Sequence, residues 1–106
     1  MEKERIYRVI ISDRAKHALG VKVRFMAEIS KSAAQKTKKN LIDAMRSLST
    51  MPQRFPFFEE EFIPCNKYRK MFVEKWYLVL YQVKDDAVYV ETILDCRQEY
   101  TWLLHE

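Results

Sequence analysis

The stretch that decides the fold is residues 68–94, which read YRKMFVEKWYLVLYQVKDDAVYVETIL. It holds three runs rich in aromatic and β-branched side chains, 68–73, 76–83 and 87–94, and each run has the length of an ordinary strand. Short polar links, EK and KDD, separate the runs and suit tight turns. Three strands that follow one another at this spacing predict an antiparallel meander.

Upstream of the meander, the sequence predicts a further strand and a helix. Residues 6–11, IYRVII, have the composition of a strand, and either Ser12 or Asp13 can cap the helix that follows. Gly20 lies inside this helix and costs about 1 kcal/mol relative to alanine, so we expect close packing or a local break to compensate for it. One face of the helix is apolar, with Ala15, Ala18, Leu19, Val23, Met26 and Ile29 at intervals of three and four residues.

A second helix is predicted from a cap at Ser30 or Ser32 to about residues 49–50, because Pro52 disfavours helical geometry just before it. The link between the two helices is short, so they should form an antiparallel hairpin. Residues 52–66 combine prolines, phenylalanines and an acidic run, which indicates an irregular loop whose aromatic side chains lie on the core. Residues 97–104 are expected to form either a short helix or an extended edge.

The predicted order of elements is therefore β-α-α-β-β-β within one domain spanning residues 1–106. The first strand must join the meander to bury its own apolar face. This gives an α+β fold in which a helical hairpin packs on one side of a four-stranded, mainly antiparallel sheet.

Composition excludes several functional classes. The chain of 106 residues has a single glycine, whereas phosphate-cradling loops of nucleotide-binding folds need several. Cys65 and Cys96 are too few for a disulfide scaffold and, with His17 and His105, show no metal-site spacing, so we expect no metal and no cofactor. The charged N-terminus lacks the apolar run of a signal peptide and no run is long enough to span a membrane, so the cytoplasm is the expected location.

The charge is unevenly distributed along the chain. Residues 1–54 carry 13 basic and 5 acidic side chains, a net of +8, whereas residues 55–106 carry 6 basic and 10 acidic ones, a net of −4. A basic half favours an acidic partner, such as nucleic acid, the ribosome or an acidic protein segment, although lysines can also simply solvate a helix. The candidate partner-binding residues are those on the outer face of the second helix: Lys36, Lys38, Lys39 and Arg46.

With these elements in place, the chain resembles the RelE/ParE superfamily of toxins from type II toxin–antitoxin systems. The resemblance rests on the order of elements, on YRKMFV at 68–73, on WYLVLYQV at 76–83 and on the stretch 86–100 that ends in ILDCRQEY. It implies a small toxin that is neutralised by a cognate antitoxin and forms an oligomer with it. RelE-like members cleave messenger RNA on the ribosome without a metal, and ParE-like members inhibit DNA gyrase.

The resemblance also implies site residues. Arg69 stands where RelE-like nucleases often have a catalytic lysine, Arg97 stands near their C-terminal arginine, and Tyr100 near their tyrosine, so these three are the catalytic candidates. The candidates for contact with nucleic acid or another target are Lys67, Lys70, Trp102 and His105.

Two positions depart from the nuclease pattern, because Met71 and Leu78 stand where RelE-like chains have a lysine and an arginine. Metal-free RNA cleavage needs fixed cations around the phosphate, and one such donor is typically worth about 2.7–4 kcal/mol. Arg97 could instead pair with Glu91 or Glu99, a surface contact worth at most about 1 kcal/mol. The alternative to a toxin is a repurposed member that only binds nucleic acid or a partner protein.

Overall fold

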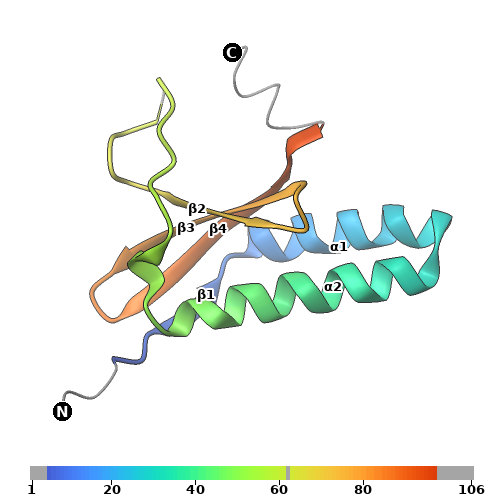
Figure 1. Cartoon of the computed structure of the whole chain (residues 1–106), viewed down its shortest axis with the longest axis horizontal. Coiled ribbons are helices and arrows are strands. Elements are labelled where there is room, and N and C mark those ends of the chain that lie inside the picture. The colour runs from blue at the N-terminus through green and yellow to red at the C-terminus, as the bar shows by residue number, and fades with distance from the viewer. Residues whose placement is uncertain (1–4, 62, 98–106) are drawn as a thin grey trace.

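The computed structural model describes residues 5–61 and 63–97 of the chain. The predicted order β-α-α-β-β-β is confirmed (Figure 1). Two short 3₁₀ turns, Ser47–Ser49 and Pro52–Arg54, follow the second helix. The strands and helices are β1 (Arg8–Ile11), α1 (Asp13–Ile29), α2 (Lys31–Arg46), β2 (Arg69–Val73), β3 (Tyr77–Lys84) and β4 (Ala87–Asp95).

The four strands form one mixed sheet in the order β1-β4-β3-β2. The meander β2-β3-β4 is antiparallel, and β1 lies parallel to β4, with Arg8 opposite Ala87 and Ile11 opposite Val90. The helical hairpin therefore carries the chain from one edge strand, β1, to the other, β2. The prediction of a mainly antiparallel sheet is confirmed.

Serine caps set the starts of both helices. The Ser12 hydroxyl accepts a hydrogen bond from the Ala15 amide at 3.0 Å, and the Ser30 hydroxyl accepts one from the Ala33 amide at 3.2 Å. Only Ser30 separates α1 from α2, and the two helices lie side by side and antiparallel, as predicted (Figure 1).

The expectation for Gly20 was wrong. Helix α1 is continuous through this residue, and a Cβ atom added there would meet nothing within 4 Å. Neither close packing nor a helix break at Gly20 offsets the conformational entropy that this glycine loses on folding.

The main core lies between the hairpin and one face of the sheet. Along β3, Tyr77, Val79 and Tyr81 alternate onto this face and are at most 3% exposed. The helices bury one face each against these strands, as their apolar spacing predicted. The helical contributors to this core are Ala15, Ala18, Leu19 and Met26 from α1, and Leu41, Ile42, Ala44 and Met45 from α2, with Leu48 from the turn after it.

A second, smaller cluster lies on the opposite face of the sheet. Leu78 and Leu80 of β3 point there and pack with Phe58, which is 1% exposed. The loop that carries Phe58 also pairs with β2, because the Lys70 amide donates to the Pro56 carbonyl at 3.0 Å. The prediction of an irregular loop with aromatic side chains on the core is confirmed for Phe55 and Phe58.

Within the described residues, the helices are all too short or too polar to cross a membrane. The prediction of a short helix or extended edge at 97–104 falls almost wholly on residues outside the described range, as do Tyr100, Trp102 and His105.

Candidate functional site

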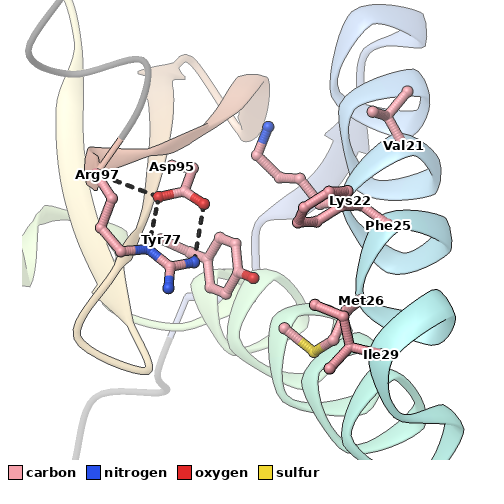
Figure 2. A pocket seen from close by; sticks show the side chains of 8 residues that line it. All are labelled: Val21, Lys22, Phe25, Met26, Ile29, Tyr77, Asp95 and Arg97. Carbon is pink, nitrogen blue, oxygen red and sulfur yellow. Dashed lines mark hydrogen bonds and ion pairs between the residues drawn. The ribbon is translucent and has the colours of Figure 1, made fainter.

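A groove of about 260 Å³ lies between the second half of α1 and the neighbouring ends of β3 and β4. Figure 2 shows its two walls facing each other across the gap, one from α1 and one from the strands. The lining residues are Val21, Lys22, Phe25, Met26 and Ile29 on the helix, and Tyr77, Asp95 and Arg97 on the strand side.

The helical wall is an apolar stripe that the fold leaves uncovered. Val21, Phe25 and Ile29 recur every four residues and are 42%, 60% and 78% exposed. The hairpin runs on past the ends of the strands, so the last turns of α1 have no sheet beneath them (Figure 1). The assignment of Ile29 to the buried face of this helix was therefore wrong, and the sequence interpretation missed Val21 and Phe25.

The strand wall is polar and its charges are paired. Arg97 donates to Asp95 from Nε to Oδ1 at 3.1 Å and from Nη2 to Oδ2 at 2.9 Å (Figure 2). The Arg97 backbone amide also donates to Asp95 Oδ1, at 2.9 Å. The guanidinium lies over the Trp76 ring, 5.1 Å from its centroid. The prediction that Arg97 pairs with Glu91 was wrong, because Glu91 contacts Arg14 instead, at 3.9 Å; the alternative partner, Glu99, lies outside the described residues.

Burial of Asp95 and its pairing with Arg97 have opposite effects on the pKa of its carboxyl. Burial alone would raise the pKa of this carboxyl, but the hydrogen bonds and the charge of Arg97 bring it below its ordinary value. In Tyr77, burial and the negative charge of Asp95 raise the pKa of the phenol. At neutral pH the strand wall thus presents a charged carboxylate–guanidinium pair beside a neutral phenol.

Arg69, the first catalytic candidate, is engaged elsewhere in the molecule. Its Nη1 atom donates to the carbonyls of Phe55 at 2.7 Å and Gln53 at 3.2 Å, and its guanidinium stacks on the Phe57 ring at 4.0 Å. These contacts hold the loop that follows α2 against the edge of the sheet. Arg69 therefore has a structural role in fixing this loop.

The structure does not bring the two candidate arginines, Arg69 and Arg97, together. Arg69 pairs with Tyr81 across the sheet, and Asp95, which holds Arg97, pairs with Tyr77. The two β3 partners are four residues apart, which is about 13 Å at the rise of a strand. Tyr100, the third candidate, lies outside the described residues.

The two positions that depart from the nuclease pattern are both buried. Met71 is 3% exposed in the main core, and Leu78 is fully buried in the second cluster on the opposite face. A lysine or arginine at either place would have to lie in an apolar interior, at a large desolvation cost.

The remaining candidates lie apart from the groove. Lys67 is exposed, with its ammonium 5.2 Å from the centroid of the Tyr68 ring, and Lys70 is half-buried on β2. Lys36, Lys38, Lys39 and Arg46 are all exposed on α2, as predicted, and their role in binding stays a prediction.

Comparison with known proteins gives the family. The model of the family described as the ParE toxin of the type II toxin–antitoxin system parDE matches residues 9–100. A solved structure titled "Chromosomal ParDE TA system from P. aeruginosa" is similar, with a TM-score of 0.70 at 15% identity, over 85% of this chain and 96% of that one. No curated protein sequence matches. With a sheet and hairpin of the same fold and a family match over most of its length, the chain belongs to the ParE toxin family of type II toxin–antitoxin systems.

Proposed function

We propose that the chain is the toxin of a toxin–antitoxin pair, that its cognate antitoxin binds the groove between α1 and the strands, and that its cellular target is DNA gyrase. The toxin would act by binding gyrase and would not cleave RNA. The family match supports the toxin role, the exposed apolar side chains of the groove support the place of the antitoxin, and the buried apolar residues at 71 and 78 speak against RNA cleavage. Gyrase is the target that the resemblance to ParE-like toxins implies.

The groove has the features of a helix-binding site. Val21, Phe25 and Ile29 offer three apolar contacts over eight residues, which is about 12 Å along the helix axis. An amphipathic helix of the antitoxin can lay its own apolar side chains against this stripe. Arg97, 48% exposed in its side chain, stands at the opposite wall, where it can also meet an acidic group of the partner.

The absence of a cation at position 78 carries the case against RNA cleavage. In RNA cleavage the phosphate gains charge in the transition state, and fixed donors beside it supply much of the rate. Leu78 is fully buried, and Met71 nearly so, at the positions where RelE-like nucleases have cations. Arg69 and Arg97 remain, but each is bound to acceptors of its own chain, and the β3 partners of Arg69 and Asp95, Tyr81 and Tyr77, are about 13 Å apart along the strand.

The groove assignment can be tested with two matched phenylalanines. Phe25 is 60% exposed in the groove, and Phe72 is 53% exposed on β2, outside the groove. The antitoxin candidate is the product of the open reading frame adjacent to the toxin gene, and its binding to each purified variant is measured by calorimetry. Phe25→Ala should weaken binding at least about tenfold, as for a central apolar anchor. Phe72→Ala should change it little.

Two outcomes would contradict the groove assignment. Equal weakening by both variants would mean that general destabilisation, and not a contact, lowers the affinity. Unchanged binding by Phe25→Ala, together with loss of binding by Phe72→Ala, would place the antitoxin on the opposite face of the sheet.

A further inference from the structure

A second surface, on the outer side of α2, is chemically unlike the groove. We define the outer stripe as Lys31, Lys38, Lys39 and Arg46, all of which are exposed. The buried side chains of α2, Ala34, Thr37, Leu41 and Met45, form a separate stripe along the same helix. Between the cations of the stripe lies a shallow hollow of about 530 Å³, lined by Gln35, Lys38, Lys39, Ile42, Asp43 and Arg46.

Most of the positive charge of the outer stripe is left uncompensated. Helix α2 carries five lysines and arginines against one aspartate, a net of +4. The aspartate, Asp43, accepts a hydrogen bond from Lys39 at 2.7 Å. Lys38 and Arg46 make no ion pair with any residue that the structure describes. These two cations on the rim of the hollow are therefore available to an external anion.

The kind of anion follows from what the stripe lacks. A protein partner is normally anchored by a few buried apolar side chains. No large apolar side chain of α2 is exposed, and Ile42 in the hollow is half-buried, whereas the α1 groove exposes three such residues. A polyanion needs no apolar anchor, because Lys and Arg bind it by displacing its condensed counterions.

The length of the stripe suits a nucleic acid duplex. From Lys31 to Arg46 the helix advances fifteen residues, which is about 22 Å. Successive base pairs of DNA rise about 3.4 Å along the duplex axis, so the stripe, laid along that axis, spans about six base pairs. We propose that the outer stripe of α2 binds the phosphate backbone of duplex DNA. This inference does not depend on the proposed function, because the groove and the outer stripe lie on different helices.

The test uses the purified full-length chain and a labelled DNA duplex of mixed sequence, with binding followed by fluorescence anisotropy between about 50 and 200 mM salt. Lys38→Gln combined with Arg46→Gln should weaken binding at least about tenfold at the low-salt end. It should also reduce the slope of log affinity against log salt by about 1.8, because each neutralised phosphate contributes about 0.9. Phe25→Ala, in the groove, should leave DNA binding unchanged.

The matched control removes the same charge elsewhere. Lys67→Gln combined with Lys70→Gln takes two cations from the β2 side of the molecule and should alter binding by less than about twofold if the stripe is the site. The proposal is overturned by any of three results: no measurable binding by the wild-type chain at low salt, equal losses in both double variants, or a larger loss in the β2 variant. Binding of poly-glutamate as tightly as of the duplex would also overturn it, because the stripe would then be a site for acidic polypeptide.

Discussion

Asp95 holds Arg97 by two side-chain hydrogen bonds, 3.1 Å from Nε to Oδ1 and 2.9 Å from Nη2 to Oδ2, on the strand wall of the groove. The side chain of Asp95 is 9% exposed and that of Arg97 is 48% exposed, so the pair is half open to water. The arrangement fixes the guanidinium beside Trp76, on the lining of the groove.

This pair predicts a pH-dependent contribution to stability. Because the folded-state pKa of Asp95 is lowered, its contribution is fully present above the unfolded pKa of about 3.9 and is lost as the pH falls through the folded value. Asp95→Asn should lower the free energy of unfolding by about 1–2 kcal/mol at pH 7. Urea unfolding at pH 7 and at about pH 3 should show the variant and the wild type converging at the acidic end.

A matched control for that prediction is Asp43→Asn, which removes an exposed partner of Lys39 on α2. An exposed pair of this kind contributes about 0.3–0.5 kcal/mol, so the effect at pH 7 should be smaller than that of Asp95→Asn. If both variants cost the same at pH 7, the Asp95–Arg97 pair would be no more than a surface ion pair.

A second prediction concerns the turn between β2 and β3. Glu74 in this turn accepts hydrogen bonds from the Thr37 hydroxyl, at 2.8 Å, and from the Asn40 amide, which ties the sheet to α2. Thr37 is only 5% exposed, so Glu74→Ala leaves a buried hydroxyl without its acceptor. We expect a loss of about 1–3 kcal/mol in the free energy of unfolding, measured by urea denaturation.

The neighbouring residue provides the control for the turn. Lys75 also has a positive φ, 73° against 52° for Glu74, so alanine at either place meets similar backbone strain. Lys75→Ala should cost less than about 0.5 kcal/mol, as for an exposed substitution. A loss as large as that of Glu74→Ala would show that backbone conformation, and not the link to α2, explains the effect.

Gly20 offers a stabilising substitution. A Cβ atom at this position has open space around it, and the helix continues on both sides. Gly20→Ala should raise the free energy of unfolding by about 0.5–1 kcal/mol, because alanine loses less conformational freedom in a helix. A thermal melt should shift upward by a few degrees, and an unchanged or lower Tm would contradict the open environment.

From the buried hydroxyl of Tyr81 we predict a loss of stability at alkaline pH. Its hydroxyl donates to the Pro52 carbonyl at 2.6 Å, and burial raises its pKa to about 12, although Arg69 and Arg54 act in the opposite direction. Because the pKa of Tyr81 is higher in the folded than in the unfolded protein, the stabilisation by its neutral hydroxyl is fully present below the unfolded pKa of about 10. This stabilisation is lost as the pH rises through the folded pKa. Tyr81→Phe should show a smaller fall in unfolding free energy between pH 10 and 12, whereas Tyr89→Phe, at an exposed tyrosine, should behave as the wild type does.

The strands and helices could be predicted because their signals are local. The three runs of 68–94 alternate or concentrate apolar residues over a few positions, and Ser12 and Ser30 supply caps that act on amides three residues away. These interactions involve neighbours in sequence, so the order of residues specifies them directly.

The groove could not be predicted in the same way. The spacing of Val21, Phe25 and Ile29 is visible in the sequence, but it is also the spacing of a core stripe. Whether such a stripe is buried depends on where α1 crosses the sheet, which is a property of tertiary packing. The acceptors of Arg69 are backbone carbonyls of the loop that follows α2, and no side-chain pattern marks them.

The most direct test of the central claim is induced expression of the chain in a bacterium, with messenger RNA integrity and the DNA-damage response measured in the same culture. The account predicts arrested growth, intact messages and an induced DNA-damage response, as expected when gyrase is inhibited. Rapid cleavage of messages without DNA damage would contradict it, and normal growth would indicate a family member that is no longer a toxin.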